Sequence, residues 1–323
     1  DKISLIRSMT SKTGVHASGQ YLIRSGYEER GTIKHPNMGA WAQHFQGPSH
    51  ATLPSSVCVN RQPQNGNGFF PSSFSPLPIL DPEAGLQYSK SAVDATVLEK
   101  RLSMLDQLDS GFRDRFQTAS VKSYTQFYEN TVNLMASSDL DAFHLENEPD
   151  ELRERYGDNS LGQGCLLARR LVENGIRYIE VAAGGWDMHT NLEEAMEERG
   201  GQLDIALATL LSDLADRGLL ETTLVVLCSE FGRGPKINAN GGRDHHPKVF
   251  STLLAGGGVK GGFVYGSSDE AGHAVADKEV KVQEFLATIG WSLGLPLDEV
   301  AMSTSGRPFT YNNKAKPVLD LFV

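Results

Sequence analysis

The sequence predicts a three-layer α/β sandwich, in which a mainly parallel central sheet lies between two layers of helices. After Gly164, apolar strand-like runs alternate with amphipathic helices, which is the order of elements that builds parallel sheets. The run from Thr223 to Cys228 is almost entirely apolar, as expected for a strand that is buried on both faces. The chain has 323 residues and is expected to form one domain over residues 1–323.

The first half of the chain contains fewer regular patterns. Ile3 to Ile6 reads as a short strand, and a helix-like stretch surrounds Trp41 to Phe45. Pro, Ser, Asn and Gly dominate residues 48–82, which predicts a long irregular excursion built from turns. Residues 91–156 contain little glycine and have leucines at helical spacing, so a helical layer over the sheet is expected there.

Strands and helices alternate regularly in the second half. Leucines on one face predict each helix, and glycines mark helix ends, as in Asn174-Gly175. In chain order, the predicted elements are a helix Cys165 to Glu173, a strand Ile176 to Val181, a helix from about Asn191 to Arg217, strands Thr223 to Cys228 and Phe250 to Ala255, and a helix Val282 to Leu293. Ligands in such folds bind beyond the carboxyl ends of the strands, so functional side chains are expected in the segments that follow those ends.

Composition excludes several classes of protein. Thirty Lys and Arg against 40 Asp and Glu give a net charge of −10, which argues against a nucleic-acid binder. No apolar run approaches the roughly 20 residues that a membrane-spanning helix needs. The three cysteines, Cys58, Cys165 and Cys228, are too few and too far apart for a disulfide framework or a zinc ribbon. The Walker, GxSxG and HExxH motifs are also missing.

Three segments next to the ends of predicted strands carry carboxylates and imidazoles. Residues 184–189 follow the strand that ends at Val181, residues 229–233 follow the next strand, and residues 242–247 precede the strand 250–255. A single Asp-x-His is usually a helix cap beside a surface histidine, but three such clusters favour a divalent cation site. The predicted ligands are Asp187, His189, Glu230 and one or both of His245 and His246, with Asp244 as a further ligand or as the partner that orients an imidazole. Zinc is the expected metal, with manganese, iron or calcium as alternatives.

Two arginines and a polar loop complete the candidate site. Arg233 and Arg243 stand beside the proposed ligands, where they could bind an anionic oxygen ester or orient a ligand carboxylate. His16 lies in a polar loop after the first strand, and it could protonate a leaving group or contact the anion. Ser18, two residues after His16, is the nearest hydroxyl in the sequence that could act as a nucleophile. The alternatives are a solvated turn histidine and a hydroxyl that caps a helix beginning near Gln20.

Four segments in order, GWDMHTN, SEFGRGPKIN, GRDHHP and LLAGGGVKGG, closely resemble the bacterial family called domain of unknown function 1501. The opening SLIRSMTSKTGVHASGQYLIRSGY is similar to its amino-terminal half. That family is placed in the alkaline phosphatase and sulfatase superfamily, whose members hold one or two divalent metals at the carboxyl edge of a parallel sheet. The resemblance implies that Asp187, His189, Glu230 and one of His245 and His246 occupy metal-site positions.

The chain departs from the superfamily pattern in two places. Phe231 stands where the superfamily has a metal-binding His, and the strand with the first metal Asp normally precedes the point where this chain begins. The chain starts Asp-Lys-Ile-Ser without an initiator Met or a signal peptide, so we expect its amino terminus to be incomplete. Family members often carry a twin-arginine signal, which implies export to the periplasm. The Cys-x-Pro-x-Arg sulfatase signature is absent.

Together these observations predict a metal-dependent hydrolase whose substrate is a small phosphate or sulfate ester. The arginines would stabilise the anionic transition state. The alternative is a non-catalytic, metal-stabilised binding or assembly protein of the same fold, which the Phe231 departure favours. Fold analogy alone does not separate the two.

Overall fold

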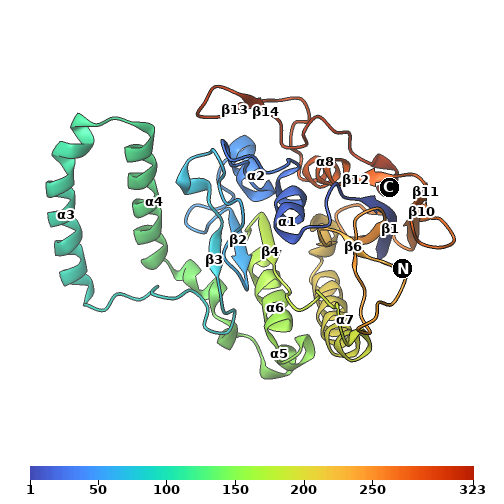
Figure 1. Cartoon of the computed structure of the whole chain (residues 1–323). Helices are drawn as coiled ribbons and strands as arrows, with labels where there is room; N and C mark the ends of the chain where they lie inside the picture. The colour runs from blue at the N-terminus through green and yellow to red at the C-terminus, as the bar shows by residue number, and fades with distance from the viewer.

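The computed structural model describes residues 1–323, apart from the side chain of Ala119. It shows an α/β protein with small, mostly separate sheets (Figure 1). The helices are α1 (His16–Ser25), α2 (Met38–Gln46), α3 (Ala95–Arg115), α4 (Ala119–Met135), α5 (Asp150–Tyr156), α6 (Ser160–Glu173), α7 (Leu192–Asp216) and α8 (Val282–Ser292). Short 3₁₀ segments lie at Ser72–Phe74, Ser138–Phe143, Leu145–Asn147, Leu220–Thr222 and Leu319–Leu321.

The largest sheet has five strands and mixed directions. Its order is β12-β1-β8-β5, and β9 also pairs with β1. The strand bounds are β1 Ile3–Thr10, β5 Val225–Leu227, β8 Phe250–Ala255, β9 Phe263–Tyr265 and β12 Val280–Lys281. β1 is parallel to β9 and β12, whereas β8 is antiparallel to both β1 and β5. The expectation of a mainly parallel sheet is therefore wrong for this sheet, because β8 lies between β1 and β5 and runs antiparallel to both.

A second sheet has three strands, all parallel, in the order β3-β2-β4. β2 (Ser56–Val59) and β3 (Leu77–Ile79) come from the segment that was expected to be irregular, and β4 is Tyr178–Val181. Every residue of β2 is buried, so this four-residue strand has no alternating pattern to reveal it among the prolines and serines around it. Three two-stranded sheets complete the fold: β6 (Gly232–Arg233) with β7 (His245–His246), β10 (Ser267–Ser268) with β11 (Val275–Asp277), and β13 (Ala301–Met302) with β14 (Pro308–Phe309).

The two larger sheets do not join. β4 pairs only with β2, and β5 pairs only with β8, so each ends its sheet with a free edge. Apolar packing nevertheless connects them, because Ile179 of β4 and Val225 of β5 pack on the same hydrophobic cluster. On the other side of the strands, Tyr178 and Val226 both pack on the second cluster.

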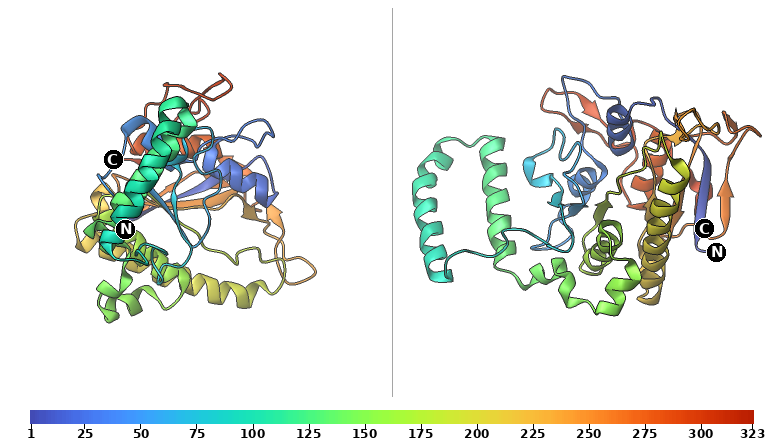
Figure 2. Two further views of the ribbon diagram at one scale, coloured as in Figure 1. Left: turned by 90° about the vertical axis from the view of Figure 1, so that its left-hand side faces the viewer. Right: turned by 60° about the horizontal axis from the view of Figure 1, so that its bottom comes forward.

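Those two clusters form the core. One combines β1 and β8 with helices α1, α2 and α8, and it includes Ile6, Leu22, Trp41 and Phe285. The other combines β2 and β3 with helices α6 and α7. Figure 2 shows the ribbon from two further directions. Each fully buried Leu, Ile or Phe stabilises the fold by roughly 1.5–3 kcal/mol relative to an exposed one. The clusters therefore fix the strand ends from which the polar loops leave.

Helices α3 and α4 form a hairpin in which α3 stands away from the rest of the protein, whereas α4 contacts the 3₁₀ segment Ser72–Phe74 (Figure 1). None of the residues described in α3 is buried. The expectation that residues 91–156 cover a sheet is therefore wrong for α3, although Leu134 at the end of α4 and Tyr156 of α5 join the core. No helix in the described part of the chain is both long and apolar enough to cross a membrane.

Candidate metal centre

Polar side chains from four loops meet where β1, β4 and β5 end. His16 is the first residue of α1 and follows β1, while Asp187 and His189 lie in the loop after β4. The short β6–β7 ladder pairs Arg233 with His245 and presents both to the same point. α1 begins at His16 rather than near Gln20, so His16 belongs to the first turn of a helix and not to a loop.

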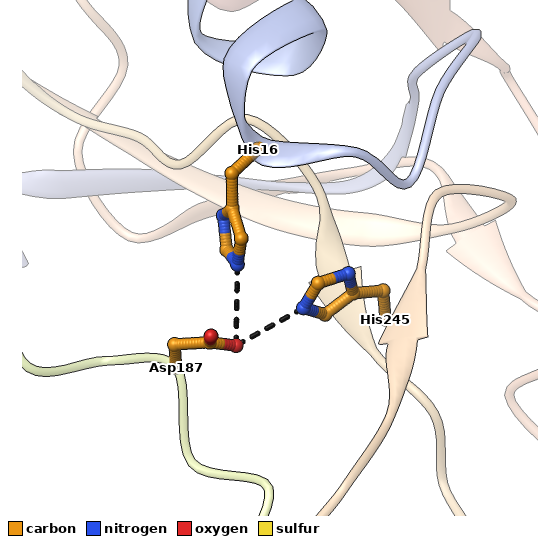
Figure 3. Close-up of side chains that lie close together, drawn as sticks. All are labelled: His16, Asp187 and His245. Carbon is orange, nitrogen blue, oxygen red and sulfur yellow. Dashed lines mark hydrogen bonds and ion pairs between the residues drawn. The ribbon is translucent and has the colours of Figure 1, made fainter.

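The carboxylate of Asp187 lies at the centre of this cluster. Its Oδ1 is 3.2 Å from Nε2 of His16, 3.0 Å from Nε2 of His189 and 3.0 Å from Nε2 of His245. Figure 3 shows the rings of His16 and His245 directed at this oxygen from α1 and β7. Three residues, His16, Asp187 and His245, offer ligand atoms that all lie within 4.8 Å of one another.

The outer nitrogen of each imidazole is held by an oxygen. Nδ1 of His16 is 2.6 Å from Oε1 of Glu230, and Nδ1 of His245 is 2.6 Å from the carbonyl oxygen of Gly14. Nδ1 of His189 is 3.2 Å from Oδ1 of Asp244. A carbonyl oxygen can only accept, so Nδ1 of His245 must be the donor, and the same assignment suits the two carboxylate contacts. In its neutral form, a ring of this tautomer directs an Nε2 lone pair inward.

Those inward lone pairs need a positive partner. Nε2 of His189 and Nε2 of His245 are only 3.0 Å apart, a distance that two lone pairs do not tolerate unless a proton or a cation lies near them. Nε2 of His16 is shielded from solvent and makes no hydrogen bond, although the Asp187 carboxylate is close. Metal-binding histidines in proteins show this pattern, with one nitrogen on an oxygen and the other free for the ion. The donor set therefore fits a divalent cation with mixed nitrogen and oxygen ligands.

Arg233 is the positive group that the cluster contains. Its guanidinium pairs with the Asp187 carboxylate, approaches Nε2 of His189 at 3.3 Å and donates to the carbonyl oxygen of Arg243 at 3.1 Å. This contact holds the pKa of Asp187 well below its usual range. Asp187 is thus a carboxylate at any physiological pH.

Glu230 supports His16 instead of approaching the common point. Burial alone would raise the pKa of Glu230, but the contact with His16 and hydrogen bonds from Gln20 and Ser229 lower it overall. The same contact raises the pKa of His16. Gly19 makes the approach possible, because a Cβ there would lie only 3.0 Å from Cβ of Glu230. The structure thus places Glu230 behind an imidazole, as an orienting carboxylate.

Four other sequence candidates lie outside the cluster of Nε2 atoms. Asp244 contacts His189 and accepts a hydrogen bond from Asn238. Of its two predicted roles, metal ligand or partner of an imidazole, this position matches the second. His246 points away, with Nε2 3.1 Å from the carbonyl oxygen of His273.

Arg243 and Ser18 are the remaining two. Arg243 makes no side-chain ion pair among the residues that the structure describes, and its Nε is buried without a hydrogen bond. Ser18 lies in the first turn of α1, and no hydrogen bond of its hydroxyl links it to a base in the described part of the chain.

Sequence reasoning missed a polar array behind Glu230. Gln20 donates to Glu230 and accepts from Gln64, which in turn accepts from Arg24. Arg24 also forms an ion pair with Glu180 of β4 at 2.6 Å. A signal was available, because His16, Gln20 and Arg24 are spaced four residues apart and so share one face of α1. Asn238, which binds both the backbone of His189 and Asp244, had no comparable signal.

Comparison with known proteins leads to one family. Neither a curated protein nor a solved structure shows significant similarity to the chain. The family model described as "Protein of unknown function (DUF1501)" matches residues 1–322. The match includes every residue of the cluster around Asp187 and nearly the whole chain. The chain therefore belongs to the DUF1501 family.

Proposed function

We propose that this chain is a metal-dependent hydrolase of phosphate or sulfate esters. The observation that carries the proposal is the convergence of three imidazole Nε2 atoms on the carboxylate of Asp187, with each Nδ1 held by an oxygen. Such a set is polar, partly exposed and supported by a further layer of hydrogen bonds, as a catalytic metal site requires.

His16, Asp187 and His245 would hold the ion, with His189 adjacent. A bound divalent ion would supply the positive charge that polarises the ester and lowers the pKa of an attacking water. Arg233 would then bind the anionic oxygens of the substrate through its paired N–H groups. Arg243 could add a second contact, since its Nε lacks a partner. Ser18 has no base beside it, which favours water as the attacking group.

The fold supports this proposal at a coarser level. Both hydrophobic clusters take side chains from both larger sheets, with α6 and α7 on one side and α1, α2 and α8 on the other. We therefore propose that the two sheets act as parts of one middle layer, in the three-layer arrangement of the alkaline phosphatase superfamily. The site then lies beyond the carboxyl ends of β4 and β5, where α/β folds bind ligands.

Phe231 favours a second candidate, a metal-stabilised binding protein without turnover. Its ring packs 5.0 Å from the ring of His16 and 4.6 Å from that of His245, so an apolar wall stands where the superfamily offers an imidazole. A wall of this kind orients the two rings but supplies neither a ligand nor a proton.

Neighbouring histidines provide a matched test. The protein is stripped with EDTA, dialysed against zinc or manganese, and assayed for bound metal by mass spectrometry and for hydrolysis of p-nitrophenyl phosphate and p-nitrophenyl sulfate. We expect His245→Ala to lose the metal and at least 100-fold in turnover, while His246→Ala keeps both. Equal metal binding by the two variants would refute the site. Metal binding without hydrolysis of either ester would establish the second candidate instead.

A further inference from the structure

In the α3–α4 hairpin, α3 lacks the packing that normally stabilises a helix. α3 has 21 residues and projects from the protein with no buried residue among those described (Figure 1). Helices in proteins obtain most of their stability from burying an apolar face, and isolated helices in water are marginal. An ordered α3 therefore needs something to cover that face.

The second half of α3 exposes a row of apolar side chains that continues to Phe116 just after the helix. Met104, Leu108, Phe112 and Phe116 follow one another at four-residue spacing, and Leu105 lies beside them. Leu108 is 78% exposed and Met104 is 64% exposed. α4 has a face of its own, formed by Tyr124, Phe127 and Tyr128, with Tyr124 67% exposed. These eight large side chains are each at least 38% exposed. Because a fully exposed aromatic side chain offers roughly 150–250 Å², their exposed area is on the order of the ~800 Å² that each partner buries in a standard protein interface.

Charge indicates which partner fits. The hairpin, residues 95–135, carries five basic and five acidic residues and is neutral, although the whole chain has a net charge of −10. A helix that binds anionic membranes would have an excess of Lys and Arg on its polar face. A neutral surface on an acidic protein instead allows two copies to approach each other without like-charge repulsion at the contact.

We propose that the α3–α4 hairpin is a dimerisation surface, and that its partner is the hairpin of a second copy of this chain. α3 of one copy packs on α4 of the other, and a two-fold axis repeats the contact to give four helices. Arg101 and Arg115 lie seven residues before and after Leu108, at the two ends of the apolar face of α3, so this pairing brings guanidinium groups to the aromatic face of α4. Pairing α3 with α3 would instead bring these arginines together.

The test compares charges added on and off that face. One variant is Leu105→Glu with Leu108→Glu, and the matched control is Ser103→Glu with Gln107→Glu, which adds the same two charges on the opposite side of α3. Oligomeric state is measured on the full chain by sedimentation velocity from about 1 to 100 µM. We expect wild type and control to be dimers, and the face variant to dissociate with a Kd at least 100-fold higher at unchanged helical circular dichroism.

Two results would overturn the proposal. A wild type that stays monomeric at 100 µM has no such interface. If that monomer also sediments with phosphatidylcholine vesicles, the hairpin binds membrane surfaces instead. A dimer that both double variants retain must use another surface. If the double variant unfolds, Leu108→Ala replaces it, and dimerisation by that variant as tight as wild type counts against the proposal.

Discussion

Replacing Arg169 with Met is expected to destabilise the protein through the carboxylates that it leaves behind. The Arg169 side chain is completely buried, and its nitrogens lie 2.7 Å from Glu148, 2.7 Å from Glu173 and 2.9 Å from Asp213. The contacts to Glu148 and Asp213 are ion pairs without straight hydrogen-bond geometry. Both of those carboxylates are 9% exposed, so neither can recover full hydration when the guanidinium is removed.

The size of the loss follows from the partners that remain. Removing one member of a buried ion pair costs about 3–5 kcal/mol, and the lower end applies here because Arg170 still pairs with Glu148 and Arg217 with Asp213. An unfolding entropy of about 2.1 cal/mol/K per residue then converts about 3 kcal/mol into a fall in Tm of about 4 °C. Glu173 is 42% exposed, so Glu173→Gln should cost no more than about 1 kcal/mol.

Urea unfolding followed by circular dichroism measures both variants against wild type, and calorimetry gives Tm. A loss below about 1 kcal/mol in Arg169→Met, or a gain in stability, would show that the buried carboxylates are not left uncompensated, and would refute the reasoning.

Three further predictions concern pH, glycine and the site. Burial alone would raise the pKa of Glu148 and Asp213, but their arginine partners lower both overall. The stability that these lowered pKa values contribute is complete above the unfolded pKa of about 4 and is lost as pH falls. Arg169→Met should therefore flatten the decline in unfolding free energy from pH 5 to pH 3, which urea titrations measure. Gly242→Ala should strongly destabilise the protein, because the new Cβ would lie 2.0 Å from the backbone of the loop after β4. Gly111→Ala lies in α3 with open space around it and should stabilise the protein by about 0.5–1 kcal/mol. Thermal melts compare the two variants. Asp244→Asn should weaken zinc binding roughly 10–100-fold by loosening an imidazole, which calorimetric titration measures.

The sequence was informative where an element is long or its pattern continuous. The strand Phe250–Ala255 and the helix from Val282 were located to within a residue, and the exits of β4 and β5 were correctly expected to carry polar loops. Short strands in the 48–82 segment were missed, because four fully buried residues show neither alternation nor length. Periodicity also does not show that a helix such as α3 packs against no other element, because it predicts an apolar face and not the element that covers it.

The site was harder to resolve than the fold. His245 and His246 are adjacent on β7, and successive residues of a strand face opposite sides, so one joins the cluster and the other turns away. Composition cannot choose between them, because the choice depends on the register of β7 against β6. The same holds for Glu230, whose position after β5 was clear, while its contact with His16 depends on how closely α1 approaches at Gly19.

The break between β4 and β5 has a consequence for how the molecule responds to cold. No ladder of backbone hydrogen bonds joins the two larger sheets, so apolar side chains such as Ile179 and Val225 carry much of the connection. Hydrophobic attraction weakens on cooling, whereas the ladders within each sheet do not depend on it in the same way. The apolar contact between β4 and β5 should therefore loosen first near 0 °C. Amide hydrogens along the free edges of β4 and β5 should then exchange with solvent long before those between β1 and β8.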